Sequence, residues 1–412
     1  MRTLPLVEYV PSRSCVLSPA ERDSLLALGP KIAVSPTPGV EGQYDITPTS
    51  WVGAVNLGTL LVEIRPKLPI SRVLFLLSYA MHPAHWRQIE FAFDETDALV
   101  EAVIPGFVAQ VRRAIQLGVL QGYHTEDEAL MTVRGRIRFD EQLRRRFGRV
   151  PPVEVRYDDF TEDIEENRLL KAALTRLKGL RIRSEWVRRA LGAFDLLLQP
   201  VSLVEYHPGA LPQIAYTRLN ERYRGAIELA RLILRATSFE MRHGAVRATS
   251  FLINMNDVFE DFVVTALREA LGVSERDFLQ GANGKTFSLD RTGRVVLKPD
   301  ISWWEGGRCV FIGDIKYKRI NVAGIKHPDL YQLLAYTVAS GLPGGLLVYA
   351  AGEGEPVRHE VVRIGKELEV MTLDMSGSPE EILRTVDDVA SVVRRQRSTV
   401  LAQTLGEWSA AG

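Results

Sequence analysis

Hydrophobic and polar positions alternate near the start of the chain and recur at helical spacing further on. The segment 59–69 alternates until two prolines end it, which predicts a strand, and 44–58 predicts a preceding strand that ends at Gly58. Apolar residues at helical spacing follow over 70–81. The pattern therefore predicts a β-rich N-terminal region with a helix against it.

Helical periodicity dominates the middle of the chain. Within 131–160, strand character appears around Gly135 and again after Pro151 and Pro152. The segments with helical spacing are 96–121, 165–180, 184–198 and 220–237. We find no internal repeat and no long linker in the sequence. These segments predict a largely helical connector.

The last third of the chain alternates strands with helices. An amphipathic helix over 256–272 ends at Gly272, a common C-terminal stop. The segments that follow are a strand pair at 294–304 and 308–320, a helix at 327–341, a strand at 344–352, a strand near 358–371 and a helix from Pro379. Strands that alternate with covering helices predict an α/β domain with a mixed sheet.

A chain of 412 residues exceeds one typical domain. We predict an α+β multidomain protein with a β-rich region at 1–155, a helical connector at 156–250, and a C-terminal α/β domain at 251–412 whose mixed sheet is flanked by helices. The boundaries rest on changes of pattern, since no linker marks them.

Composition excludes several classes of protein. Lys and Arg together number 51, as do Asp and Glu, so no overall charge attracts the chain to DNA or to a membrane. Two distant cysteines, Cys15 and Cys309, support neither a disulfide framework nor a zinc knuckle. Without a signal peptide or an apolar run of about 20 residues, the sequence predicts a cytoplasmic protein with no membrane segment.

Candidate chemistry lies in the strand pair of the last third. Folding the chain about Gly306 and Gly307 places residue 300 opposite residue 313, so Asp300 and Asp314 lie beside each other. Side chains on one face of such a pair are about 5 Å apart. Period-two alternation places Lys316 on the same face as Asp314.

Two adjacent carboxylates repel each other unless a cation joins them. Mg²⁺ prefers hard oxygen ligands and keeps several of its waters, which leaves room for a phosphate. The spacing therefore predicts a magnesium site in which Asp300 and Asp314 bind the metal and Lys316 holds or helps to deprotonate an attacking water. Alternatively, each fragment taken alone is an ordinary solvated strand face or turn.

Pro299-Asp300, followed by Asp314-Ile315-Lys316, matches the signature of the PD-(D/E)xK nucleases. This resemblance implies that Glu260, in the preceding helix, assists as a third metal ligand. The alternative for Glu260 is an ordinary residue on a helix surface.

The same resemblance extends to the helix after the motif. Gln332 and Tyr336, one helical turn apart, match the QxxxY element of this superfamily and would support the catalytic site. The alternative for this pair is a contact between the helix and the sheet.

Longer segments resemble the McrC family, the nuclease subunits of McrBC-type 5-methylcytosine-specific restriction systems. The resemblance runs through nearly the whole chain in order, and the segments that carry it are 46–80, VRGRIRF (133–139), YDDFTEDIEENRLLKAAL (157–174) and NDVFEDFV (256–263). It implies a partner, the McrB AAA+ GTPase ring, which reads methylated cytosine and is engaged by the N-terminal region, here residues 1–155. It also implies Mg²⁺-dependent cleavage of double-stranded DNA and stimulation of the partner's GTPase.

Two other functions stay open from the sequence. The chain would be a standalone PD-(D/E)xK nuclease if it cut DNA without a motor, or a non-catalytic adaptor if its task were to activate an NTPase ring. The sequence contains no GxxxxGK[ST] phosphate-binding loop, so we do not expect this chain to hydrolyse GTP itself.

Overall fold

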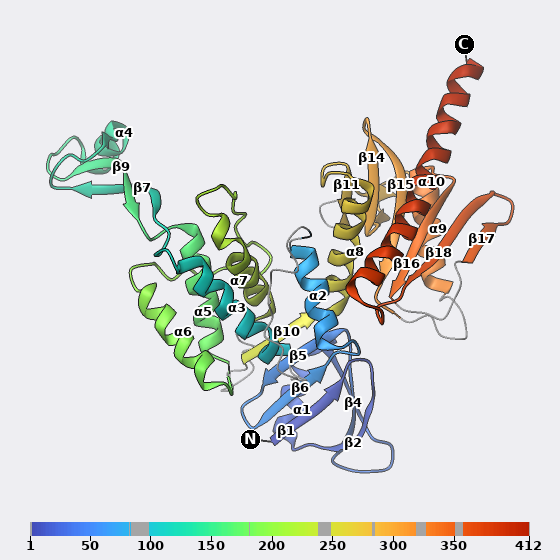
Figure 1. The fold of residues 1–412 in the computed structure, drawn as a ribbon, viewed down its shortest axis with the longest axis horizontal. Helices are drawn as coiled ribbons and strands as arrows, with labels where there is room; N and C mark the ends of the chain where they lie inside the picture. The colour runs from blue at the N-terminus through green and yellow to red at the C-terminus, as the bar shows by residue number, and fades with distance from the viewer. Residues whose placement is uncertain are drawn as a thin grey trace.

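The computed structural model describes residues 2–81, 83, 99–180, 182–237, 249–281, 285–318, 327–350 and 357–411, with side chains except at 100, 101, 249 and 404–411. Within these residues the fold mixes helices with several separate sheets (Figure 1). The prediction of an α+β protein with more than one sheet is confirmed.

Two sheets form the N-terminal part. One has the order β1-β6-β5-β10 and joins Arg2–Val7, Leu60–Arg65, Trp51–Asn56 and Thr249–Asn254. The other has the order β2-β4-β3 and joins Ser12–Val16, Gln43–Pro48 and Ile32–Pro36, with helix α1 (Pro19–Leu26) beside it. These two sheets account for the strands predicted near the start of the chain, and β10 brings a strand from far along the chain into one of them.

The single strand predicted over 44–58 is wrong. The strand structure is interrupted at Thr49 and Ser50, which separate β4 from β5, and these two strands belong to different sheets. The Thr49 hydroxyl donates to the carbonyl of Lys31 at 2.9 Å, and the Ser50 carbonyl accepts from the Met255 amide at 2.8 Å. These long-range hydrogen bonds stabilise the bend between the two strands, which the pattern of apolar and polar residues does not predict.

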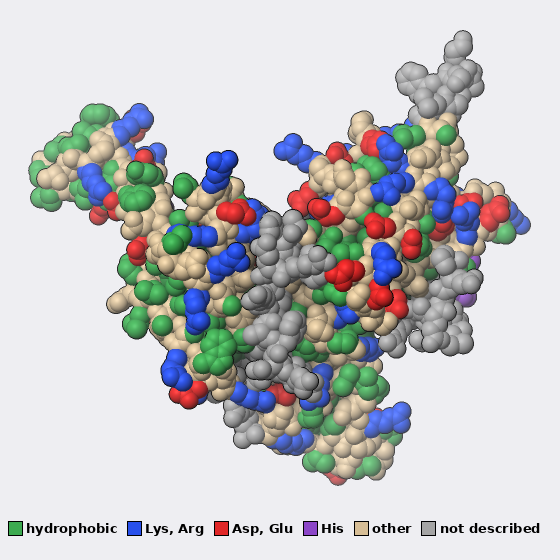
Figure 2. All heavy atoms as spheres, viewed as in Figure 1, with side chains coloured by type: hydrophobic (Ala, Val, Ile, Leu, Met, Phe, Trp, Pro, Cys, Tyr) green, Lys and Arg blue, Asp and Glu red, His purple; other side chains and the backbone are tan. Residues whose placement is uncertain are grey.

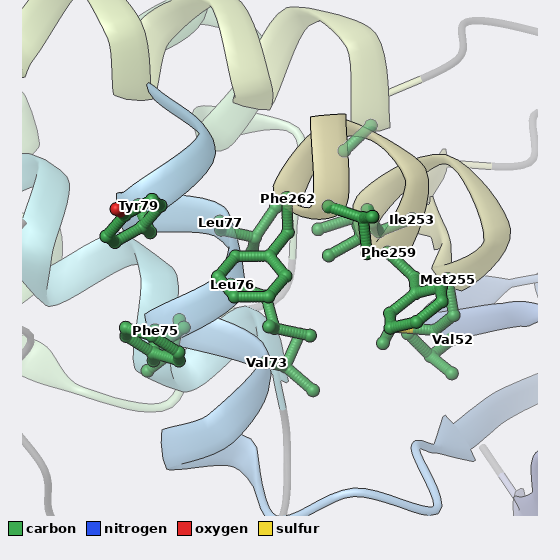
Figure 3. Packing of buried hydrophobic residues seen from close by; sticks show 14 of the residues in the cluster. Val52, Val73, Phe75, Leu76, Leu77, Tyr79, Ile253, Met255, Phe259 and Phe262 are labelled. Carbon is green, nitrogen blue, oxygen red and sulfur yellow. The ribbon is translucent and has the colours of Figure 1, made fainter. Parts of the chain in front are cut away.

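Helix α2 (Ile70–Met81) matches its predicted range and packs on α8 (Met255–Leu271). The rings of Phe75, Tyr79 and Phe262 meet edge to face with centroids 5.4–5.9 Å apart. Figure 3 shows this aromatic cluster beside the apolar residues that join α8 to the N-terminal sheet. The helix that carries Glu260 therefore rests directly on the N-terminal part.

The predicted helices of the middle region are confirmed, although the one predicted over 96–121 ends six residues early and its first three residues lie outside the described part of the chain. The helices are α3 (Leu99–Ile115), α5 (Glu165–Lys178), α6 (Glu185–Leu197) and α7 (Arg224–Ala236). The α5 helix packs against α6 and α7.

A small unit projects from these helices at one end of the molecule (Figure 1). It consists of β7 (Gly122–Leu130), β8 (Arg136–Ile137), α4 (Phe139–Arg146) and β9 (Val153–Thr161). The strand character predicted around Gly135 and after Pro151 and Pro152 is confirmed by β8 and β9, and α4 lies between them, where the pattern predicted no element. Two acids in the first turn of α4 and three arginines in its last turn favour a helix, because they complement its dipole.

A six-stranded sheet with the order β11-β14-β15-β16-β18-β17 forms the C-terminal part. The strands are Phe278–Gln280, Ile301–Glu305, Arg308–Lys316, Gly344–Ala350, Lys366–Leu373 and Val357–Val361. Pairing of β14 with β15 is antiparallel, whereas β16 runs parallel to both β15 and β18. The predicted mixed sheet is confirmed.

Helices flank this sheet on both sides. The hydroxyl of Tyr349 donates to Asp329 of α9 (His327–Ser340), while Glu369 accepts from Gln396 of α10 (Pro379–Ala411). Tyr349 is paired with Thr372, three positions after Glu369, so period-two alternation places α9 and α10 on opposite faces. Helix α8 packs against α10.

Two predicted strands are interrupted in the structure. The stretch 294–304 is divided at Pro299, which has no N–H to donate, into β14 and the short strand β13 (Val296–Leu297). The stretch near 358–371 turns back through Arg363 and Gly365, both at positive φ, and so forms β17 and β18. Among the described residues, no helix has the length and apolarity needed to cross a membrane.

Candidate active site

The β14–β15 hairpin turns where its sequence predicts, but its register differs from the prediction by one residue. Glu305 pairs with Arg308 across Gly306 and Gly307, which both have positive φ. An irregularity next to Trp304 then shifts the pairing, so that Ile301 lies opposite Gly313. The predicted pairing of 300 with 313 is therefore wrong, because Gly313 pairs with Ile301, and Asp300 precedes this pair and accepts the amide of Ile315.

Asp300, Asp314 and Lys316 converge at the end of β15. The Lys316 Nζ atom lies 2.5 Å from Asp314 Oδ2 and 3.4 Å from Asp300 Oδ2. Asp300 Oδ2 also accepts the amide of Ile315 at 2.8 Å. The predicted convergence of two carboxylates and one ammonium is confirmed, and Asp314 is fully buried.

Burial controls the charges of this cluster. It raises the pKa of the Asp314 carboxyl, and the neighbouring Asp300 raises it further, against the opposing effect of Lys316. Burial lowers the pKa of Lys316, but Asp314 and Asp300 more than compensate, so the pKa of the ammonium is raised overall. Lys316 is therefore held in its charged form between two carboxylates.

Glu260 approaches the same cluster from α8. Burial and the charge of Asp300 raise the pKa of Glu260 to about 7. The side-chain amide of Gln280, on β11, donates to Glu260 Oε1 at 3.2 Å and to Asp261 Oδ1 at 2.7 Å. Gln280 thus joins two acids of α8 to the sheet.

Gln280 is absent from the prediction. A neutral amide in a three-residue strand matches no motif, and the only signal near it is Gly281. A Cβ on Gly281 would lie 3.3 Å from Glu260 Oε1, and the Gly281 amide donates to the Asp300 carbonyl at 2.9 Å. The sequence does not show that Gly281 is required by the close approach of Glu260, because that requirement becomes apparent only when the position of α8 is known.

Gln332 and Tyr336 on α9 bond to each other and to the strand that leads into the site. Gln332 Nε2 donates to the Tyr336 hydroxyl at 2.6 Å, and this hydroxyl donates to the Lys298 carbonyl at 2.9 Å. Burial and the charge of Asp314 raise the pKa of Tyr336 to about 12. These bonds join the helix to the sheet, as expected if Gln332 and Tyr336 have a structural role. The Gln332 side chain is exposed.

The site also contacts the N-terminal part. The hydroxyl of Tyr317, next to Lys316, donates to Glu8 Oε2 at 3.3 Å, and its ring lies 5.8 Å from that of Phe259, next to Glu260. Glu8 is fully buried, and burial raises its pKa to about 7. Tyr317, the neighbour of Lys316, therefore links a buried acid of the N-terminal part to Phe259, the neighbour of Glu260.

The donor set of the cluster suits a hard divalent cation. Both carboxylate oxygens of Asp314 are buried and accept no hydrogen bond from the described residues, although Lys316 forms an ion pair with one of them. No three Asp, Glu, His or Cys side chains in the described part of the chain gather closely enough to hold a metal. The arrangement offers the one or two carboxylates that Mg²⁺ uses when water completes its shell.

Comparison with known families identifies the relationship of the chain. The family model of the McrBC 5-methylcytosine restriction system component matches residues 46–350, well over half of the sequence. The chain belongs to this family. The part of the chain that the family model matches extends from β4 to the end of β16. It includes all the candidate site residues, Glu260, Asp300, Asp314, Lys316, Gln332 and Tyr336.

One solved structure is similar in fold over nearly the whole chain. A chain of a half-complex from a tetradecameric assembly of Thermococcus gammatolerans McrB AAA+ hexamers with bound McrC is 18% identical, with a TM-score of 0.56, over 94% of this chain and 100% of that one. A chain of the Thermococcus gammatolerans McrBC complex is 20% identical over 65% of this chain and 88% of that one, with a TM-score of 0.41. No curated protein matches the sequence.

Proposed function

We propose that this McrBC-family protein is the DNA-cleaving subunit of a modification-dependent restriction complex. The observation that carries the proposal is the fully buried carboxylate of Asp314 beside the partly buried carboxylate of Asp300, with the ammonium of Lys316 near both at the end of β15. A core without a catalytic task gains little from this arrangement, because burying paired charges costs free energy. The PD-(D/E)xK signature matches the same three residues.

Asp300 and Asp314 would hold Mg²⁺, and Glu260 would assist them from α8. When bound, the ion polarises a phosphodiester and lowers the pKa of a bound water. The burial of Asp314 favours this role, because its Oδ1 atom has neither a hydrogen bond nor an ion pair with the described residues, and a buried carboxylate oxygen in that state is stabilised by a cation.

Lys316 would orient the attacking water and offset the negative charge that develops on the phosphate in the transition state. Its raised pKa keeps the ammonium protonated, so we assign it hydrogen-bond donation rather than proton removal. The water would form the new bond to phosphorus as the bond to the leaving oxygen breaks, and the proton that the water releases would be balanced by the proton that the leaving oxygen takes up. Tyr336, fixed to the Lys298 carbonyl, would keep α9 against this edge of the site, with Gln332 orienting its hydroxyl.

The partner in this proposal is an AAA+ GTPase ring of the McrB type, as in the assembly whose McrC chain has a similar fold. Residues 1–155 would engage the ring. The neutral net charge of the chain fits a complex in which the partner supplies much of the grip on DNA.

The test is cleavage of methylated and unmethylated DNA with the AAA+ GTPase expected from the neighbouring gene. Asp314→Ala and Lys316→Ala should abolish cutting while partner binding and GTPase stimulation persist. Asp388→Ala, which removes an exposed acid of α10, is the matched control and should cut normally. Full cutting by Lys316→Ala would refute the catalytic assignment.

The same assay separates the other two functions. GTP-independent cutting by this chain alone would identify a standalone nuclease. DNA restriction retained in an Asp300→Ala/Asp314→Ala double variant would identify a non-catalytic adaptor.

A further inference from the structure

A two-stranded hairpin stands between β11 and β14 and was not expected from the sequence pattern. Its strands are β12 (Phe287–Ser288) and β13 (Val296–Leu297). Over 285–298 it contains four basic residues and one acid, although the whole chain has no net charge. The basic residues are Lys285, Arg291, Arg294 and Lys298, and all four are exposed.

The only acid of the hairpin is used inside its own turn. The Asp290 carboxylate accepts the amide of Val295 at 2.8 Å and the amide and hydroxyl of Thr292. Neither Arg291 nor Arg294 forms an ion pair with any described residue. The tip therefore has a fixed shape and presents two arginines with free guanidinium groups.

The base of the hairpin is anchored to the catalytic domain. Phe287 stacks on Trp304 of β14 with centroids 5.7 Å apart, and the Lys285 ammonium lies 4.0 Å from the centre of the Trp304 ring. On the other strand, the Lys298 carbonyl accepts the hydroxyl of Tyr336. An anchored base and a braced turn reduce the conformational entropy lost when the tip binds a ligand.

We propose that this hairpin, which we term the basic arm, binds the sugar-phosphate backbone of duplex DNA beside the bond that is cut. The inference rests on the proposed DNA-cleaving function and adds the surface that holds the substrate. Exposed arginine forks that lack carboxylate partners match the geometry of phosphate oxygens. Lys298 is two residues from Asp300, so a duplex whose scissile phosphate reached Asp300 would pass along the arm.

The length of the arm fits this placement. Arg294 precedes Asp300 by six positions, which spans at most roughly 20 Å of extended chain. That distance equals about six base-pair steps of about 3.4 Å along a duplex. The tip would therefore contact backbone about half a helical turn from the cut, where it adds affinity without reading the base sequence.

The experiment measures cutting by the full chain assembled with its AAA+ partner and GTP, at limiting DNA and over a salt series. Arg291→Ala/Arg294→Ala should cut more slowly at every salt concentration, to the same extent on different sequences. The slope of log rate against log salt should become shallower by about two, roughly one for each phosphate that the arm no longer neutralises. Arg291→Lys/Arg294→Lys should retain most of the slope, because the charges remain.

Arg188→Ala/Arg189→Ala on α6 removes the same number of exposed charges and should leave cutting unchanged. Normal cutting and an unchanged salt slope in the arm variant, with an active wild type, would overturn the inference and leave the proposed function intact. Loss of GTPase stimulation in the arm variant would assign the arm to the partner instead and also overturn it. A wild-type complex that never cuts DNA would overturn both proposals.

Discussion

At the scale of single residues, burial opposes the ionisation of two carboxyl groups of the site. Glu260 and Asp314 both have raised pKa values, with burial as the main cause and Asp300 as the second. A raised carboxyl pKa means that the folded chain keeps a proton that the unfolded chain has released. For Glu260 this range is from 4.5 to about 7, so its contribution to the free energy of unfolding falls as pH rises through that range.

Metal binding should therefore depend on pH. We expect the apparent affinity for Mg²⁺ to rise from pH 6 to pH 8, because protonated carboxyl groups are poor ligands and must lose their protons first. The change should reach up to about tenfold per pH unit for each carboxyl that titrates. Calorimetric titration of Mg²⁺ at several pH values measures it.

Glu260→Gln is the control for this dependence. The variant should show a flatter pH profile, since one of the titrating groups is gone. Equal Mg²⁺ affinities at pH 6 and pH 8 in the wild type would contradict the role given to these acids.

At the scale of elements, the position of Asp314 depends on how closely three strands pack around Gly313. A Cβ on Gly313 would lie 2.9 Å from the Leu346 carbonyl oxygen and 3.0 Å from two side-chain carbons of Ile301. Leu346 belongs to β16 and Ile301 to β14, so both neighbours of β15 are already in contact with the glycine. Any side chain at this position has to push a strand aside.

Gly313→Ala should lower the free energy of unfolding by about 1–3 kcal/mol, the usual cost of overpacking. Cutting should decrease as well, because Asp314 follows directly on the displaced strand. Urea denaturation and the cleavage assay measure the two effects.

Gly192→Ala on α6 is the matched control, since nothing lies within 4 Å of its added methyl group. It should stabilise the protein by about 0.5–1 kcal/mol through helix propensity. A Gly313→Ala variant as stable and active as the wild type would show that the strands tolerate the shift.

At the scale of the molecule, the six-stranded C-terminal sheet and the small β7–β9–α4 unit lie at opposite ends (Figure 1). Figure 2 shows acidic and basic side chains intermixed over the face in view and hydrophobic side chains gathered on the small unit. The small unit exposes large apolar side chains, and that of Phe147 is 87% exposed. The others include Tyr123, Phe139, Leu143 and Phe160. Such a patch is typical of a surface that binds another protein.

Phe147→Asn should weaken partner binding and GTPase stimulation while the fold remains intact. Phe147 has a φ of 50°, a conformation that asparagine tolerates better than phenylalanine, so the substitution should not destabilise the unit. Loss of a buried phenyl ring at an interface costs about 1.5–3 kcal/mol, which corresponds to tenfold or more in affinity. Titration of the AAA+ partner against each variant, followed by GTP turnover, measures the effect.

Leu196→Gln on α6 removes another exposed apolar side chain, outside the unit, and should bind the partner normally. Unchanged GTPase stimulation by Phe147→Asn would exclude this residue from the partner interface.

Much of the site follows from local rules. The Gly306-Gly307 turn, the period-two alternation of β15 and the helical spacing of α2 and α8 act over a few residues, so the sequence alone predicted the hairpin and the meeting of Asp300, Asp314 and Lys316. The roles of Glu260, Gln332 and Tyr336 came from resemblance to a nuclease superfamily and remain predictions.

Tertiary structure decided what depends on contacts between distant segments. The irregularity beside Trp304 set which residue pairs with Gly313, and the bend at Thr49 and Ser50 sent two strands into different sheets. The link from Gln280 to Glu260 joins α8 to β11, and the contact of Glu8 with Tyr317 joins opposite ends of the chain. These features arise because packing and hydrogen bonding between separate elements select one register and one set of neighbours, whereas periodicity records only the face that each residue occupies.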